Sequence, residues 1–219
     1  MRRVTSGLFV PGWGAPASLY RAGLPDGWEV LELPWFRQTR GTLDRSFECV
    51  KEAVARRGRP VVLAGHSMGG ALALLAAAEL PQLVEQVVLV SPAGLPLDRP
   101  LHSSALTFLD QLRRGSYPLA ALRRMAINTV SGPWSALKLA RAVHGLDLTT
   151  VLQELRARGV PCTVIASDGD QLVTCRHCRE LARLLAAKYR ELHAPNGHIW
   201  PITQPERLAR ELTLAVQGG

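Results

Sequence analysis

Hydrophobic residues follow two patterns along the chain, short apolar runs typical of buried strands and longer amphipathic segments typical of helices. The runs predict strands at 4–10, 28–33, 60–64, 87–91, 162–167 and 189–193. The amphipathic segments predict helices at 43–57, about 68–80, 149–158, 176–187 and 205–216. Strands that alternate with helices indicate an α/β fold, a mostly parallel doubly wound sheet with helices on both faces. The unbroken apolar runs near 88 and 164 are typical of strands buried on both faces.

The stretch 93–147 departs from this alternation. It contains no strand-like run, and it predicts three amphipathic helices at 101–113, 119–130 and 134–143. A parallel crossover normally needs only one helix. We therefore expect a helical cap, inserted into a single domain of residues 1–219, over the edge where open α/β sheets bind ligands. The alternative is that these helices are ordinary layers of the domain.

Composition sets limits on the class of protein. The 219 residues are 47% hydrophobic, which is enough to fill a sizeable core. The net charge is +8, but the basic residues are spread along the chain, so we expect a solvated basic surface and no nucleic-acid partner. No apolar run is long enough for a membrane span, and the apolar stretch near the N-terminus is too short for a signal peptide. These features predict a cytoplasmic protein.

The cysteines include one pair, Cys175 and Cys178, with the C-x-x-C spacing of a metal or redox site. A zinc site would need two further ligands at a similarly short spacing, and the sequence offers no second pair of that kind. We therefore interpret Cys175 and Cys178 as thiols on a helix face and expect no metal.

The most informative motif is Gly65-His66-Ser67-Met68-Gly69, which has the form G-x-S-x-G. It follows the predicted strand 60–64 and precedes a run of helix-forming residues. On such a strand-to-helix turn the serine hydroxyl is lifted above the sheet edge, where it can meet a substrate. Ser67 is therefore a candidate nucleophile.

A serine nucleophile needs a base, usually a histidine, that a carboxylate orients. With this kind of turn the acid and the histidine follow the serine in that order. The strand 162–167 is followed by Asp168 and Asp170, and we favour Asp170 because it lies beyond a glycine turn. His193 and His198 are the candidate bases, and we favour His198 because it lies on the loop beyond the last strand.

Stabilising a tetrahedral intermediate requires two backbone N–H donors. One is expected from Met68, directly after the nucleophile, and the other from the loop after the first strand. That loop reads Gly12-Trp13-Gly14, and its glycines permit close approach of the backbone. We assign the second donor to Trp13, whose indole is also positioned to contact substrate.

These motifs together resemble the α/β-hydrolase family along the whole chain. The matching segments are Pro11-Gly12-Trp13-Gly14, Gly65 to Gly70, Asp170 with Leu172-Val173, and Gly197-His198 followed by Pro205-Glu206. Two departures stand out. Pro11 occupies a position where the family often has histidine, and the family's leading antiparallel hairpin is missing.

The resemblance implies a serine hydrolase that cleaves a carboxylic ester without a metal or organic cofactor. Ser67, Asp170 and His198 would form the catalytic triad, with Trp13 and Met68 as oxyanion donors. We expect an apolar acyl pocket and assign its lining to Trp13, Leu106, Leu109 and Trp200. Two rivals stay open, a different bond cleaved by the same triad and a non-catalytic ligand-binding relative.

A second resemblance points to a substrate. Gly12-Trp13-Gly14, Leu33-Pro34-Trp35-Phe36 and 198–202 are similar to the esterases that act on a pimeloyl methyl ester held by acyl carrier protein in biotin synthesis. That resemblance implies an acidic acyl carrier protein as a partner, or a thioester as the bond cleaved. The cap arginines that could receive it are Arg113, Arg114, Arg123 and Arg124. The alternative is that they are solvated on helix surfaces.

Overall fold

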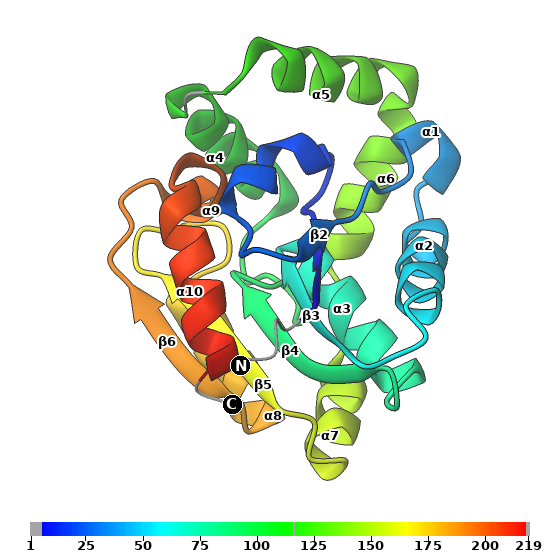
Figure 1. Ribbon diagram of the computed structural model, residues 1–219. Coiled ribbons are helices and arrows are strands. Elements are labelled where there is room, and N and C mark those ends of the chain that lie inside the picture. The colour runs from blue at the N-terminus through cyan, green and yellow to red at the C-terminus, as the bar shows by residue number, and fades with distance from the viewer. Residues whose placement is uncertain (1–5, 116, 218–219) are drawn as a thin grey trace.

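The computed structural model describes residues 6–115 and 117–217 and contains one six-stranded sheet (Figure 1). All the strand pairs among the described residues are parallel, and the strand order is β2-β1-β3-β4-β5-β6. The strands are β1 (Gly7–Val10), β2 (Trp28–Val30), β3 (Val61–His66), β4 (Val84–Val90), β5 (Cys162–Ser167) and β6 (Lys188–Leu192). The strand order reverses between β1 and β3, which is the topological switch point where ligands bind in open α/β sheets.

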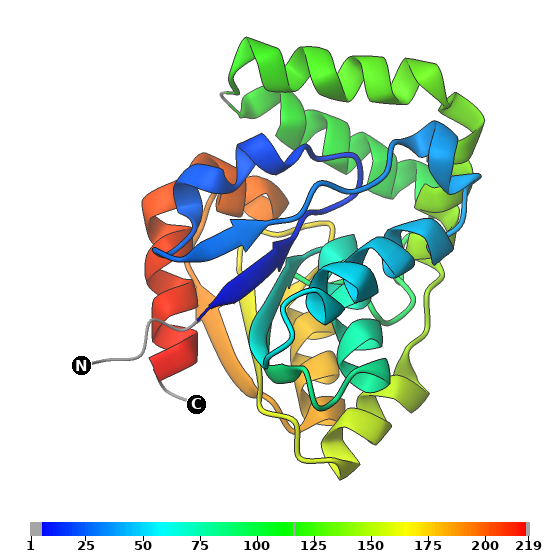
Figure 2. The same cartoon turned by 45° about the vertical axis from the view of Figure 1, so that its right-hand side comes forward.

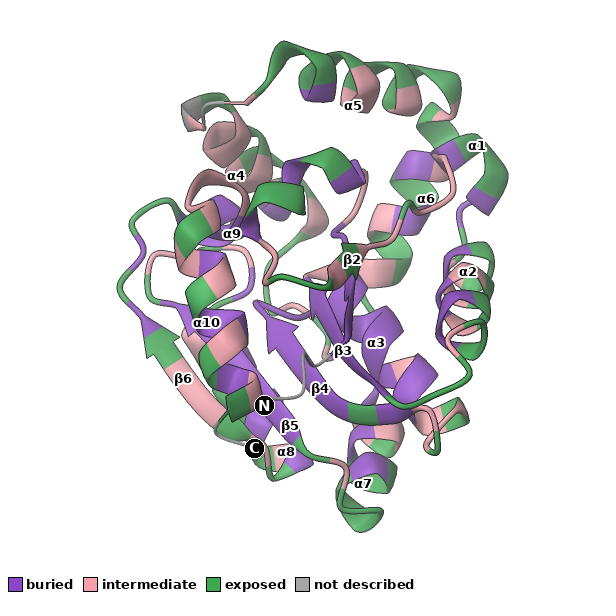
Figure 3. Cartoon of the chain, in the orientation of Figure 1, coloured by how far each residue is buried: buried purple, intermediate pink, exposed green. Residues whose placement is uncertain are grey.

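Helices cover both faces of this sheet. One face carries α2 (Asp44–Ala55), α3 (Met68–Glu79), α7 (Thr149–Ala157) and α8 (Cys175–Leu185). The other face carries α10 (Pro205–Gln217), seen in red in Figure 1. Figure 3 shows the central strands β1, β3, β4 and β5 as almost entirely buried, whereas the edge strands β2 and β6 are partly exposed. The predicted doubly wound parallel sheet is therefore confirmed.

Alternation along the strands divides the buried side chains into two cores. In β3, Val61 and Leu63 belong to the core beneath α3, whereas Val62 and Ala64 belong to the core beneath α10. Successive side chains of a strand point to opposite faces, so an apolar run fills both cores at once. This explains why the central strands lack a polar position at every second residue.

Three helices follow β4 and lie beyond the carboxyl ends of the strands (Figure 2). They are α4 (Leu101–Arg114), α5 (Leu119–Ser131) and α6 (Pro133–His144), which we call the cap helices. Their bounds agree within one residue with the segments predicted from the sequence. None of the helices in the described part of the chain is long and apolar enough to cross a membrane.

The differences from prediction occur at polar or short elements. The fourth strand begins at Val84, three residues before the predicted start, because Gln86 is a buried strand residue whose Nε2 donates to the carbonyl of Ala215 at 2.8 Å. The predicted strand 4–10 is seen from Gly7, and its residues 4 and 5 lie outside the described part. The sequence also did not predict five short helices: Ala17–Leu19, Arg21–Gly23, α1 (Phe36–Thr39), Gly197–Ile199 and α9 (Trp200–Thr203).

Two glycines of the G-x-S-x-G motif allow the start of α3 to pack against its neighbours. A Cβ atom on Gly69 would lie 2.0 Å from the carbonyl oxygen of Val10, at the end of β1. A Cβ atom on Gly65 would lie 2.2 Å from the carbonyl oxygen of Gly69. Real side chains do not tolerate such distances, so both positions require glycine and bring β1, β3 and α3 together.

We expect Gly69→Ala to lower the free energy of unfolding by about 3 kcal/mol, because its methyl group would overlap backbone atoms that cannot move independently. Gly145→Ala is the matched control, since a Cβ there would meet only the Arg141 carbonyl oxygen, at 3.7 Å. That variant should lie within about 0.5 kcal/mol of the wild type. Urea unfolding measures both, and equal stability of the two variants would contradict the packing argument.

Candidate active site

Ser67 lies on the turn between β3 and α3, with φ of 54° and ψ of −121°. This positive φ is uncommon for a residue other than glycine and marks a strained turn. Backbone hydrogen bonds hold it: the N–H of Ser67 donates to the carbonyl of Val90 at 3.1 Å, and the N–H of Ala93 donates to the carbonyl of Ser67 at 3.0 Å. The turn is therefore tied to the end of β4, and its side chain is partly exposed.

His198 and Asp170 form a buried pair on the loops after β6 and β5. His198 Nδ1 lies 2.8 Å from Asp170 Oδ2, and their side chains are 3% and 0% exposed. The other carboxylate oxygen, Oδ1, accepts the N–H groups of Leu172 and Val173 at 2.8 Å each. Because a carboxylate oxygen accepts, Nδ1 carries the hydrogen, and Nε2 of the neutral ring is left as an acceptor.

The competing candidates, Asp168 and His193, form a separate pair at the surface. His193 Nδ1 lies 2.7 Å from Asp168 Oδ2, and the His193 side chain is 84% exposed. The His193 contact, followed by the N–H of Ala194, lowers the pKa of Asp168. Each aspartate thus has its own histidine, and burial distinguishes the two pairs.

The structure brings the loop after β1 beside the serine. A Cβ on Gly12 would lie 3.5 Å from Ser67 Cβ, so this loop passes directly over the turn. Met68 is the first residue of α3, and the first N–H groups of a helix have no partner within it. In the described part of the chain no hydrogen bond joins Ser67 to His198. Catalytic hydrogen bonds of this kind often tighten only when substrate binds.

A buried network that the sequence analysis did not find connects the two sides of the site. His66 Nε2 lies 3.0 Å from the carbonyl oxygen of His198, and His66 Nδ1 lies 2.7 Å from the hydroxyl of Tyr20. The carbonyl can only accept, so Nε2 carries the hydrogen and Nδ1 accepts from Tyr20. The Tyr20 oxygen in turn accepts the N–H of Gly12 at 3.4 Å.

Burial keeps both side chains of this network neutral. The pKa of His66 is well below its ordinary value, first because the ring is desolvated and then because His198 is close; the two rings lie 4.7 Å apart. Burial also raises the pKa of the Tyr20 hydroxyl. The loop after β1 and the His198 loop are therefore linked through a fixed set of hydrogen bonds, for which neither Tyr20 nor His66 carries a local sequence signal.

A second missed residue, Gln111 of α4, connects the cap to the His198 loop. Its Oε1 accepts the N–H of His198 at 2.8 Å. Gly197 has a φ of 62°, and a Cβ there would lie 2.8 Å from Gln111 Nε2. The cap helix and the loop are thus in close contact, because glycine leaves room for the amide.

The residues expected to bind substrate fall into different environments. The ring of Trp13 lies 4.7 Å from that of Phe36 and meets Phe108 of α4 edge-on at 6.0 Å. Leu106 and Leu109 lie on the other side of α4 and are 66% and 57% exposed. Phe108 is therefore the α4 side chain that faces Trp13, and the assignment of Leu106 and Leu109 to the pocket stays a prediction.

Trp200, the remaining residue assigned to substrate, is fully buried in the core beneath α10. Two cavities lie beside the loops of the candidate site. One of about 20 Å³ adjoins Gly12 and Met68, and one of about 390 Å³ lies between α4 and the loops that carry Asp170 and His198. Leu106 borders the larger cavity, and Trp200 borders neither.

The cysteine pair lies on α8, away from any cluster of ligating groups. Cys178 is fully buried, which raises the pKa of its thiol, and Cys175 donates to the carbonyl of Ser167 at 3.3 Å. Within residues 6–115 and 117–217, no three His, Cys, Asp or Glu side chains are grouped so that they could hold a metal ion.

The sequence pattern of the α/β-hydrolase family matches residues 8–211, so the chain belongs to this family. The match includes both strands of the switch point and the loops that carry Ser67, Asp170 and His198. It confirms the family resemblance inferred from the motifs. No curated protein matches the sequence.

Solved structures show the same fold at low sequence identity. A thermophilic esterase from Thermogutta terrifontis is 17% identical, with a TM-score of 0.71 over 98% of this chain and 90% of that one. A lipase-esterase related protein from Clostridium acetobutylicum is 16% identical, with a TM-score of 0.75 over 96% and 93%. A bromoperoxidase from Bacillus anthracis is 16% identical, with a TM-score of 0.76 over 98% and 92%. Proteins named for different reactions thus share this fold, and the reaction must be argued from the site.

The lowered pKa of His66 makes stability depend on pH. The unfolded chain protonates His66 below about pH 6.5, whereas the folded protein does not, so this stabilisation is present above pH 6.5 and is lost as the pH falls. We expect the free energy of unfolding to decrease by up to about 1.4 kcal/mol per pH unit from this group.

His66→Gln is the comparison variant, because its amide can donate to His198 and accept from Tyr20 but does not titrate. Its free energy of unfolding, measured in urea between about pH 8 and 5, should fall less steeply than that of the wild type. His177, whose pKa is also lowered, is present in both proteins and cancels in the comparison. Parallel curves would show that His66 does not carry the effect.

Proposed function

We propose that this protein is a serine hydrolase that cleaves a carboxylic ester through an acyl-enzyme. The observation that carries the proposal is the buried His198–Asp170 pair at 2.8 Å, on loops at the same sheet edge as the strained turn of Ser67. Membership of the α/β-hydrolase family supports hydrolysis as the reaction class. The esterase and the lipase-esterase related protein with this fold are consistent with an ester substrate.

In the proposed reaction Ser67 Oγ attacks the ester carbonyl carbon while His198 Nε2 takes the hydroxyl proton. Asp170 holds the ring in the tautomer that leaves Nε2 free and stabilises the cation that forms. The N–H groups of Trp13 and Met68 bind the oxyanion. When the carbon–oxygen bond breaks, His198 gives its proton to the leaving alcohol. Water then attacks the acyl-enzyme with His198 as base, releases the acid and restores Ser67, without a metal or organic cofactor.

The acyl side of the substrate is assigned to the aromatic group formed by Trp13, Phe36 and Phe108. The rings of Phe36 and Phe108 each contact that of Trp13, and Trp13 belongs to the loop that passes over Ser67. Apolar and aromatic side chains around a few polar groups are typical of small-molecule sites. A small-molecule ester with an apolar acyl portion fits this arrangement.

A carrier-protein methyl ester or thioester remains the alternative substrate, and the geometry gives it less support. Arg124 is paired with Glu32 at 2.7 Å and lies over the ring of Trp35 at 5.8 Å, so it is not a free docking residue. Arg113 and Arg123 are exposed, and the side chain of Arg114 lies outside the described part. The free ester is therefore preferred.

We expect a fluorophosphonate probe to label the wild type at Ser67 and to leave Ser67→Ala unlabelled. Hydrolysis of p-nitrophenyl esters of increasing chain length should fall by about 10⁴-fold or more in that variant, because the triad acts as a unit. Labelling that persists in Ser67→Ala would show that another residue is the nucleophile. A wild type that takes no probe and hydrolyses no ester would favour a non-catalytic ligand-binding protein.

The two aspartates give a matched comparison. Asp170→Asn should lower kcat by about 10⁴-fold, because an amide favours the wrong tautomer of His198. Asp168→Asn removes the same charge from the exposed pair with His193 and should change kcat by less than about threefold. Both variants are assayed on the ester that the wild type hydrolyses fastest. The reversed result would mean that Asp168 and His193 are the catalytic pair.

A further inference from the structure

The helix α5 of the cap has its polar contacts on the inner side but presents most of its large apolar side chains on the outer side. On the inner side Asn128 Oδ1 accepts the N–H of Phe36 at 2.8 Å, and Arg124 pairs with Glu32. The outer side presents Leu119 and Val130, which are 81% and 79% exposed. A helix that packs on a soluble core normally turns large apolar side chains of this kind inward.

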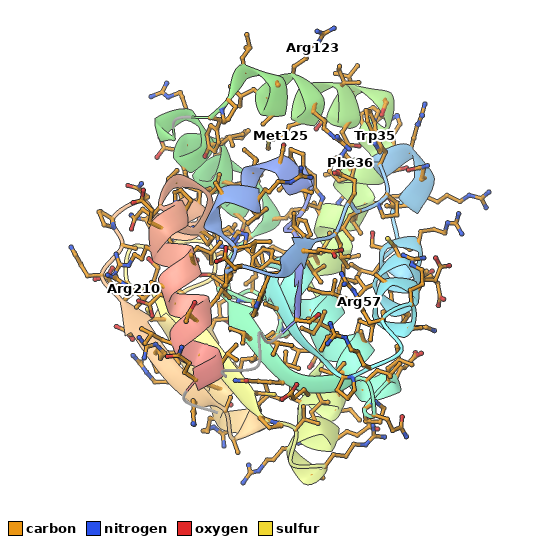
Figure 4. All side chains as sticks on the ribbon, viewed as in Figure 1. Trp35, Phe36, Arg57, Arg123, Met125 and Arg210 are labelled. Atoms are coloured by element: carbon orange, nitrogen blue, oxygen red, sulfur yellow. The ribbon has the colours of Figure 1, made fainter. Side chains whose placement is uncertain are left out.

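We call the exposed stripe the α5 outer face: Leu119, Leu122, Arg123, Ala126, Ile127 and Val130. These positions recur at helical spacings of three and four residues, so they lie on one side of the helix. Figure 3 shows this side as exposed, and Figure 4 shows Arg123 pointing away from the body while Met125 points toward it. Trp134, which is 76% exposed, is the second residue of α6, the helix that follows α5.

The exposed large hydrophobic side chains are concentrated on the cap. Of the nine large hydrophobic side chains that are exposed in the described part of the chain, eight lie on α4, α5 and α6, and the other is Leu214 of α10. Scattered single leucines would need no explanation, but a row of them on one helix marks an interaction surface.

Charge indicates what that surface contacts. Residues 119–144 contain no acidic residue. They contain four basic ones: Arg123, Arg124, Lys138 and Arg141. Three of these cations, Arg123, Lys138 and Arg141, are exposed, and none of the three forms an ion pair with another described residue. A second copy of this chain would place Arg123 against like charge with no acid on either helix to offset it. Anionic lipid offers both the apolar medium and the opposite charge.

We propose that the α5 outer face, together with Trp134, docks this protein on an anionic lipid bilayer. Leu119, Leu122, Ile127 and Val130 enter the boundary between headgroups and acyl chains. Trp134 lies at headgroup level, as tryptophan prefers, and Arg123 meets lipid phosphate. The helix lies in the plane of the interface and does not span it, in keeping with the absence of a spanning helix from the described residues. The proposal is independent of the ester hydrolase activity.

The test is sedimentation of the full chain with vesicles of phosphatidylglycerol and phosphatidylcholine in equal parts, compared with phosphatidylcholine alone. We expect stronger binding to the anionic vesicles. The double variant Leu119→Ser/Val130→Ser should bind about tenfold more weakly, because two side chains no longer enter the lipid. Arg123→Gln should bind about fivefold more weakly to anionic vesicles and little differently to neutral ones.

Matched controls come from outside the cap. Leu214→Ser removes an exposed leucine, 42% accessible, from α10, and Arg45→Gln removes an exposed arginine from α2. Both should bind vesicles as the wild type does. All the variants change exposed side chains, so their thermal unfolding should be unaltered.

The proposal is overturned if the controls weaken binding as much as the α5 variants, or if the wild type binds neither vesicle. A concentration-dependent dimer that Leu119→Ser/Val130→Ser abolishes, without vesicle binding, would assign the face to a second copy of the chain. Binding of an acidic carrier protein through Arg123, again without vesicle binding, would assign it to a protein partner. Sedimentation velocity of the protein alone separates these last two results.

Discussion

The site depends on the close contact between Gly69 at the start of α3 and the carbonyl of Val10 at the end of β1. Because no side chain separates them, the first N–H groups of α3 and the loop that follows β1 come to the same side of Ser67. Any larger residue at position 69 would push α3 away from β1 and separate Met68 from Trp13. The strained φ of Ser67 is maintained from the other side, because the N–H of Ser67 is hydrogen-bonded to the end of β4 and the turn cannot relax alone.

The loops around Ser67 are further coupled through buried polar groups. Tyr20 and His66 link Gly12 to His198, and Gln111 links His198 to the cap. Buried polar groups of this kind are costly unless each finds its partner, so they favour one arrangement of the loops. The cap is attached by the same means at its other side, where Asn128 contacts the backbone of Phe36. That polar attachment uses the inner side of α5 and leaves its leucines and valine facing outward.

Hydrophobic periodicity predicted the sheet and the cap helices, and the G-x-S-x-G motif predicted the serine turn, because each depends on local spacing. The prediction from periodicity failed where a polar residue is buried because a distant group bonds it. Gln86 is such a residue: it donates to the carbonyl of Ala215, and its polar side chain made the predicted strand begin too late. Periodicity also could not give the rotation of α4, which turns Phe108 toward Trp13 and leaves Leu106 and Leu109 largely exposed. The assignment of those two leucines to the pocket stays a prediction. Trp200 looked like a pocket residue beside His198, but the short helix that it begins turns its ring into the core.

The choice between the two aspartates shows what tertiary structure adds to a motif. Both follow β5, both have a histidine after β6, and the two pairs have nearly equal lengths of 2.7 and 2.8 Å. They differ in their surroundings. His193 is open to water, which screens its attraction to Asp168, whereas His198 and Asp170 are enclosed and receive backbone N–H groups. In the proposed reaction a charge on His198 would therefore be stabilised by a fixed, dry partner, which is why we assign this pair, and not Asp168 with His193, to the transfer of a proton to and from Ser67.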